Sequence, residues 1–180
     1  MSGNKPSPQE IFSRFDHLNK ALIDASSIIY TDRADFLEIL ASSIRLFSIK
    51  EILSEAGPVS ESIKPLNYSE TSSSNDQKLI SCALDLSLPV ISEDKKILMA
   101  MKRANRPFFN SLMMLNFLLY RRQIRNQQYI QYHQALKNFA RYSDEIWKYG
   151  ARIKTAIPES YMTALIYVKN QVIKAGGSHG

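Results

Sequence analysis

Apolar and polar positions along the chain predict strands and helices in alternation. Residues 21–30 form a short apolar run, rich in β-branched side chains and interrupted by one acid, which is typical of a buried strand that ends near Asp24. Residues 31–44 then place apolar side chains at helical spacing behind Thr31 or Asp32, either of which can cap a helix. After a polar start, the first predicted elements are therefore a strand and a long helix.

The alternation continues through the middle of the chain. The run over residues 45–49 predicts a second strand, and residues 50–57 predict a short helix that ends at Gly57. Residues 61–66 indicate a third strand. Pro65 restricts it to an edge of the sheet or to a strand end, because proline has no N–H to donate.

A loop rich in serine and asparagine is expected over residues 67–76, and Asn75 or Asp76 can cap the helix that follows it. Residues 88–92 predict a fourth buried strand and residues 106–111 a short fifth one, with a helix between them. From residue 111 onward the pattern is helical. Breaks in it fall near Asn126, Ser143 and Pro158.

Strands that alternate with helices are typical of an α/β fold with a central parallel sheet and helices on both faces. We expect a polar leader over residues 1–20, one α/β domain over residues 21–120, and C-terminal helices over residues 121–180 that form a basic extension packed on the same domain. The length of 180 residues suits one such core and is short for two.

Charge is distributed unevenly along the chain. Residues 1–94 contain 8 Lys or Arg and 14 Asp or Glu, a net charge of −6, whereas residues 95–180 contain 15 and 3, a net charge of +12. A basic half indicates a polyanionic partner such as RNA, and an acidic half indicates a cationic one. Solvated helix faces are the alternative explanation and, for charge alone, the more common one.

Several classes of protein lack support in the sequence. The longest apolar run, residues 111–120, is interrupted by Asn116 and is shorter than the roughly 20 residues of a membrane span, and no secretory signal is visible, so we expect a cytoplasmic protein without membrane contact. Cys82 is the only cysteine, which excludes an internal disulfide and a zinc site built on a cysteine pair. No glycine-rich loop follows a strand, which argues against a nucleotide cofactor.

Acidic residues at strand ends and helix starts are candidates for a metal site. Asp24 ends the first strand and Asp94 follows the fourth, so neighbouring parallel strands would bring both carboxylates to one edge of the sheet. Glu55 on the short helix and Asp76 at the next helix start belong to the same edge. Such carboxylates repel one another without a cation, and Mg²⁺ or Mn²⁺ prefers oxygen ligands. A helix cap at Asp76, a solvated acid at Glu55 and a loop acid at Asp94 remain the alternatives.

The order and context of these acids resemble those of the PIN domain, a family of metal-dependent ribonucleases. The matching stretches, which together cover residues 21–116, are LIDASSII with Asp24 and Ser26, FSIKEILSEA with Glu55, NDQKLISCALDLSLP with Asp76, and VISEDKKIL with Ser92 and Asp94. Each stretch is unspecific alone, and the resemblance rests on the four in this order. Glu93 replaces the second small or acidic residue that is often found beside the last aspartate of the family, which leaves open whether Glu93 or Asp94 faces the metal.

The resemblance implies a PIN-like three-layer fold and an acidic pocket that cuts RNA with Mg²⁺ or Mn²⁺. Asp24 and Asp94 would then be the principal metal ligands, and the other two acids would complete the cage or orient water. Ser26 and Ser92 would hydrogen-bond a carboxylate or the phosphate. A toxin-like nuclease, with a second copy of the chain and an antitoxin-like or regulatory protein as partners, stays open. The alternative is a catalytically inactive PIN-fold scaffold that binds RNA or a protein.

Three arginines of the basic half are candidates for RNA binding. Arg121, Arg122 and Arg125 are interleaved with Tyr120 and Tyr129 on one expected helical stretch. Guanidinium groups hold phosphates, and aromatic rings stack unpaired bases, so we expect RNA to lie here. Core packing of the tyrosines is the rival explanation.

Overall fold

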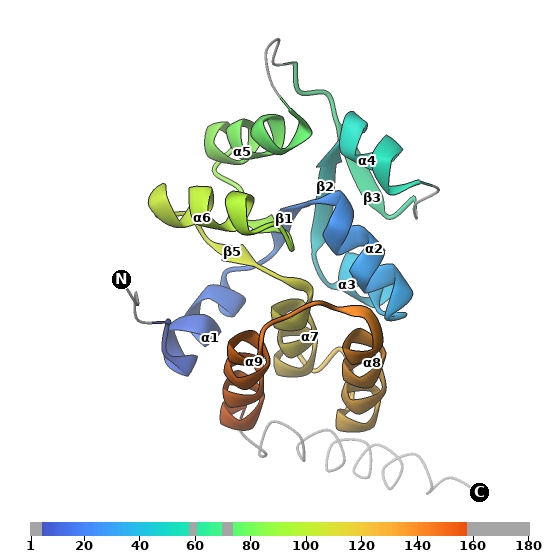
Figure 1. Cartoon of the computed structure of the whole chain (residues 1–180), viewed down its shortest axis with the longest axis vertical. Coiled ribbons are helices and arrows are strands. Elements are labelled where there is room, and N and C mark those ends of the chain that lie inside the picture. The colour runs from blue at the N-terminus through green and yellow to red at the C-terminus, as the bar shows by residue number, and fades with distance from the viewer. Residues whose placement is uncertain (1–4, 58–60, 70–73, 158–180) are drawn as a thin grey trace, which may run out of the picture.

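A five-stranded parallel sheet forms the centre of the molecule (Figure 1). The computed structural model describes residues 5–57, 61–69 and 74–157. The strands lie in the order β3-β2-β1-β4-β5, and every neighbouring pair is parallel. Their bounds are β1 Lys20–Ile23, β2 Arg45–Ile49, β3 Ile63–Leu66, β4 Val90–Ile91 and β5 Phe108–Phe109. The strand order reverses between β1 and β4, and the crevice at the carboxyl ends of such a pair is where open α/β sheets bind ligands.

Helices cover both faces of this sheet, which confirms the predicted α/β class. Figure 1 shows α5 and α6 on one side and α2, α3 and α4 on the other. The chain moves from β1 to β3 in one direction and returns through β4 to β5, so right-handed connections place the two groups on opposite faces. The bounds are α1 Pro8–Asp16, α2 Ala25–Arg33, α3 Leu37–Ser43, α4 Lys50–Ala56, α5 Asn75–Asp85, α6 Lys95–Arg103, α7 Ser111–Tyr120, α8 Asn126–Phe139 and α9 Asp144–Ala156.

The segment after β1 forms two helices, where one long helix over residues 31–44 was predicted. The strand ends at Ile23, and most of the apolar run over residues 21–30 belongs to α2, in which Ala25, Ile28 and other residues are buried. Residues 31–44 are divided between α2 and α3, because Asp35 adopts a left-handed backbone with φ of 64° that ends the first helix. The predicted end of the strand near Asp24 is confirmed, and the single long helix predicted over residues 31–44 was wrong. A short apolar run fits a buried strand and a buried helix equally well, so the run alone did not indicate where α2 begins.

The other strands and helix starts follow the sequence closely. The second strand has the predicted bounds, and β3 lies at the sheet edge, where Pro65 is tolerated. The predicted cap of α5 was one or two residues late, since the Ser74 side chain accepts from Gln77 N. Helix breaks occur near Asn126 and Ser143 as predicted, and the break at Pro158 lies outside the described residues.

The predicted polar leader over residues 1–20 contains helix α1. Ser7 caps this helix, and the Glu10 side chain closes a capping box by accepting from Ser7 N at 2.6 Å. Ile11 and Phe15, four residues apart, are buried in the core. A narrow apolar stripe is therefore sufficient to dock a helix whose composition is mostly polar.

The last described helices pack against α7, whose middle is buried on every side. Asn116 is the polar residue inside α7. Its Nδ2 donates to Gly150 O at 3.0 Å, and its Oδ1 accepts from Tyr129 OH at 2.9 Å, which joins α7 to α9 and α8. Leu136 and Ile153 continue the same core. No helix within the described ranges is long and apolar enough to cross a membrane.

Candidate functional site

Asp24 lies directly after β1, at the carboxyl end of a central strand. Its backbone N–H donates to Ile91 O at 2.9 Å, which extends the pairing of β1 with β4. The side chain is 7% exposed, and its Oδ2 accepts from Ser26 Oγ at 2.6 Å and from Ser92 Oγ at 3.0 Å. No described residue donates to Oδ1. Two serines thus orient the carboxylate and leave one of its oxygens for water or a ligand.

Asp94 lies at the same edge, at the start of α6. Its Oδ1 accepts from Lys96 N at 2.5 Å and from Ile97 N at 3.3 Å, so it is the N-cap of that helix. Its own N–H donates to Ser92 Oγ at 3.0 Å. The Ser92 hydroxyl therefore accepts from Asp94 and donates to Asp24, which links the two aspartates.

Glu55 and Asp76 come from α4 and α5, which are held to each other by polar contacts. Asn75 Nδ2 donates to Glu55 Oε2 at 3.3 Å. Lys78 Nζ forms an ion pair with Glu51 Oε1 at 2.8 Å. The hydrogen bond from Lys78 is the main reason why the pKa of Glu51 is lowered. These contacts fix the end of α4 beside the start of α5.

Asp76 is the acid on which the charges of the other three act. Asp76 has a raised pKa, first because it is partly buried and then because of the negative charges of Asp24, Asp94 and Glu55. Lys96 opposes this shift. Asp76 is therefore close enough to feel the charge of each of the other three acids. A bound cation would relieve this repulsion.

The four acids are nevertheless not arranged around one point. Across the described ranges, no group of three or more His, Cys, Asp or Glu side chains is arranged to hold a metal ion. Asp94 uses one carboxylate oxygen to cap α6, and Glu55 is exposed and bonded to Asn75. The part of the chain that the structure describes thus offers separate carboxylates at one sheet edge and no closed cage of ligands.

Glu93 has a different role from Asp94. Its Oε1 accepts from Ser27 Oγ at 3.0 Å, from Ser111 N at 2.8 Å and from Ser111 Oγ at 2.6 Å, and its Oε2 accepts from Tyr142 OH at 2.5 Å. Burial, followed by the charge of Glu93, raises the pKa of Tyr142. Glu93 therefore ties β4 to α2, α7 and the segment before α9, while the charge of Asp94 acts on Asp76.

Sequence reasoning missed this contact network of Glu93. A usable signal was present, because Ser27 and Ser111 each follow a buried strand within a few residues and are themselves fully buried. Small hydroxyl residues in such places usually have a hydrogen-bond partner. Glu93, two residues after β4, was the available acceptor.

The three candidate arginines lie away from the acids. Arg121, Arg122 and Arg125 occupy the turn between α7 and α8, so they do not share one helix as expected. The other end of α7 begins at Ser111, which bonds Glu93. The ten residues of α7 span about 15 Å, so the arginines follow the end of this helix that is opposite to the Ser111–Glu93 contact.

The two tyrosines beside these arginines pack against other side chains of the protein, Tyr129 in the core and Tyr120 half-buried at its edge. Tyr120 stacks on Phe12 with ring centroids 4.9 Å apart, and its hydroxyl donates to Asp16 Oδ1 at 2.7 Å. Tyr129 is 5% exposed and donates to Asn116. These contacts favour core packing, the rival explanation, most clearly for the buried Tyr129, while Tyr120 is half-buried.

Comparison of the chain with models of protein families and with curated proteins finds no match.

Proposed function

We propose that the chain is a metal-dependent ribonuclease with a PIN-like fold, which hydrolyses RNA phosphodiester bonds at the acidic edge of the sheet. The observation that carries the proposal is that the charges of Asp24, Glu55 and Asp94, which come from three other segments, all act on Asp76. Among the described residues, none of these acids forms an ion pair. Neighbouring carboxylates that are not held in ion pairs, with only the charge of Lys96 opposing the repulsion at Asp76, are unfavourable for folding, so a functional reason for them is favoured.

Mg²⁺ or Mn²⁺ suits the donor set, because all the candidate ligands are carboxylate oxygens. Magnesium keeps several waters and often uses only one or two carboxylates together with substrate phosphate, so open spacing is compatible with it. Asp24 and Asp94 would hold the ion, with Glu55 and Asp76 as further ligands or as acceptors from its waters. When bound, the ion supplies charge neutralisation and lowers the pKa of a water for attack on phosphorus.

The residues around the acids have supporting roles in this proposal. Ser26 and Ser92 hold the Asp24 carboxylate in one orientation through two hydrogen bonds. Lys96 is exposed beside Asp94, and its charge reaches Asp76. An ammonium group there would attract the phosphate of an RNA strand towards the acids.

A catalytically inactive scaffold of the same fold, which binds RNA or a protein, is the second candidate. It is favoured by the capping role of Asp94 and by the lack, within the described ranges, of three acids arranged around one point. In that case the acidic edge would attract a basic partner, and the basic half would bind RNA. A toxin-like nuclease with an antitoxin-like partner remains a form of the first candidate.

An RNA cleavage assay separates the two candidates. Wild type and Asp24→Asn are incubated with single-stranded and structured RNA in Mg²⁺, in Mn²⁺ or with a chelator. We expect wild type to cut only with metal and Asp24→Asn to lose about a hundredfold or more in rate. Asp32→Asn, which alters an exposed aspartate of α2, is the matched control and should cut like wild type.

The same variants report on the fold. Without metal, Asp24→Asn should melt at or above the wild-type temperature, because one of the repelling charges is gone. If wild type binds RNA but cuts none with either metal, the scaffold is the better account. Equal cleavage by Asp24→Asn and wild type would remove Asp24 from the reaction.

A further inference from the structure

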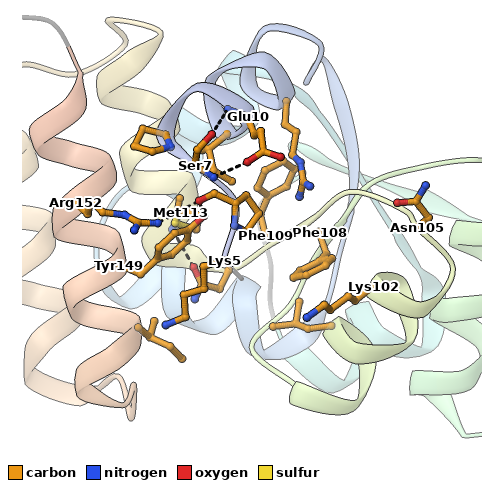
Figure 2. A pocket seen from close by; sticks show the side chains of 17 residues that line it. Lys5, Ser7, Glu10, Lys102, Asn105, Phe108, Phe109, Met113, Tyr149 and Arg152 are labelled. Carbon is orange, nitrogen blue, oxygen red and sulfur yellow. Dashed lines mark hydrogen bonds between the residues drawn. The ribbon is translucent and has the colours of Figure 1, made fainter. Parts of the chain in front are cut away.

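A cavity of about 870 Å³ lies against the edge strand β5, between α1, α6 and α9 (Figure 2). None of the four acids lines it. The volume falls in the range of about 300–1,000 Å³ that is common for small-molecule sites. This cavity is therefore a separate place at which a ligand of moderate size can bind.

The wall of the cavity is strongly basic. Its described cations are Lys5, Arg14, Lys102 and Arg152, and Glu10 is its only described acid. Clefts lined by one sign of charge concentrate ligands of the opposite sign. The cavity thus selects for an anion.

Two of these cations have no fixed ionic partner. Within the described ranges, neither Arg14 nor Lys102 forms an ion pair. The pKa of Glu10 is lowered mainly by its hydrogen bonds with Ser7, and the charge of Arg14 adds a smaller effect. Lys5, by contrast, pairs with Glu145 at 3.6 Å, and Arg152 donates to a backbone carbonyl at 3.2 Å. Arg14 and Lys102 are therefore the groups most available to hold a bound anion.

An aromatic surface lies beside the basic groups. Figure 2 shows Phe108 on the cavity wall close to Lys102, with Tyr149 on the opposite side. Phe108 is half-buried and forms no ring contact with another aromatic residue in the described part of the chain. Tyr149, by contrast, already lies near the cationic groups of Lys5 and Arg152, at 5.5 and 5.2 Å from its ring centroid. The face of Phe108 is thus open to stacking by a planar ligand.

We propose that this cavity binds a nucleotide unit, with its phosphate held by Arg14 and Lys102 and its base stacked on Phe108. Arginine and lysine form charge-assisted hydrogen bonds to phosphate, and base stacking on an aromatic ring requires no particular sequence. A simple inorganic anion would leave the aromatic wall unused. The lack of a glycine-rich loop argues only against a phosphate cradle of backbone N–H groups, whereas the contacts here come from side chains.

Two sources could supply this chemistry, a free nucleoside monophosphate or the phosphorylated end of an RNA strand. Calorimetric titration of the full chain with AMP, adenosine, inorganic phosphate and a short 5′-phosphorylated single-stranded RNA distinguishes them. If AMP binds more tightly than adenosine and phosphate, a free nucleotide is sufficient. If only the phosphorylated RNA binds, and more tightly than its dephosphorylated form, the strand end is the ligand.

Variants test the assigned residues for whichever ligand binds. Lys102→Gln and Arg14→Gln should each weaken binding about three- to tenfold, and Phe108→Leu should weaken AMP or the RNA end while leaving the affinity for phosphate unchanged. Arg103→Gln, which alters the neighbouring exposed cation outside the cavity, is the matched control and should bind like wild type.

The proposal is overturned if neither AMP nor phosphorylated RNA binds, if adenosine or phosphate alone binds as tightly, or if Arg103→Gln is as harmful as Lys102→Gln. Asp24→Asn should retain wild-type binding at the cavity, because Asp24 does not line it. Loss of ribonuclease activity and loss of this site are therefore measured separately.

Discussion

The hydroxyl of Ser92 donates a hydrogen bond to Asp24 Oδ2 at 3.0 Å, between two neighbouring strands. The contact arises from the strand register. Ile23 on β1 pairs with Ile91 on β4, so the residues that follow them, Asp24 and Ser92, lie next to each other at the ends of the two strands. The same oxygen of Ser92 accepts from Asp94 N at 3.0 Å. One buried side chain thus connects the two acids proposed as principal metal ligands.

Replacement of Ser92 by alanine should lower both stability and activity. Asp24 loses a donor and Asp94 N loses its acceptor, which should reduce the free energy of unfolding by about 1–3 kcal/mol. A freer Asp24 carboxylate should also slow RNA cleavage by about tenfold. Urea unfolding and single-turnover cleavage measure the two effects.

Ser48→Ala is the matched control for this substitution. Ser48 is equally buried, on β2, and donates to Ile23 O at 2.7 Å without contact with an acid. The substitution Ser48→Ala should reduce the free energy of unfolding by a similar amount and leave the cleavage rate of the folded protein close to that of wild type. Equal losses of activity in both variants would show that Ser92 acts through stability alone.

Asp76 should make the protein less stable as pH rises. Its folded pKa is raised above the ordinary value of 3.8, so the folded state holds this proton more tightly than the unfolded state. The resulting stability is fully present below 3.8 and is lost as pH increases through the raised pKa. Asp76→Asn lacks this loss, so its stability relative to wild type should increase over the same interval.

Urea unfolding of both proteins in metal-free buffers, from below pH 3.8 to neutrality, measures the difference. Mg²⁺ should restore wild-type stability at neutral pH and have a smaller effect on Asp76→Asn. Asp32→Asn should follow the wild-type curve. A constant difference between Asp76→Asn and wild type at every pH would contradict the electrostatic account.

Much of the sheet could be predicted from the sequence, because short apolar runs indicate the strands and Gly, Pro and Ser residues indicate where the elements end. The bounds of β2 and the edge position of β3 follow from residues 45–49 and from Pro65 alone. The edge shared by Asp24 and Asp94 also follows, since both stand at ends of buried parallel strands.

The remaining features depend on tertiary packing. Nothing near Tyr129 indicates that its hydroxyl donates to Asn116, and only the packing of α8 on α7 buries both. The break between α2 and α3 depends on a left-handed residue, Asp35, that the apolar pattern does not mark. The basic cavity combines segments from both ends of the described chain, so no local motif could indicate it.

Glu93 should contribute strongly to stability. Truncation in Glu93→Ala leaves Tyr142 OH and the Ser111 donors without their acceptor, which should cost about 2–4 kcal/mol in the free energy of unfolding. Glu93→Gln retains an oxygen acceptor and should lose less. Glu61→Ala, at an exposed position outside this contact network, should change stability by no more than about 0.5 kcal/mol. Equal stability of Glu93→Ala and Glu61→Ala in urea would contradict the assigned role.

The turn between α7 and α8 provides the last test, of whether RNA reaches beyond the acidic edge. Arg121, Arg122 and Arg125 are exposed there, and their guanidinium groups can contact phosphates. Each phosphate contact on a single strand contributes about 0.7 to the slope of log affinity against log salt, so three contacts contribute about 2.

RNA binding by the triple variant Arg121→Ala, Arg122→Ala, Arg125→Ala, measured over a salt series, should therefore show weaker affinity and a slope smaller by about 2. Arg45→Ala, which removes an exposed arginine at the start of β2, is the control and should change neither quantity. Because α7 separates this turn from the acids, the cleavage rate at saturating RNA should remain near wild type. If the triple variant keeps the wild-type affinity and slope, RNA does not follow this surface, and the positive charge serves solubility or a protein partner.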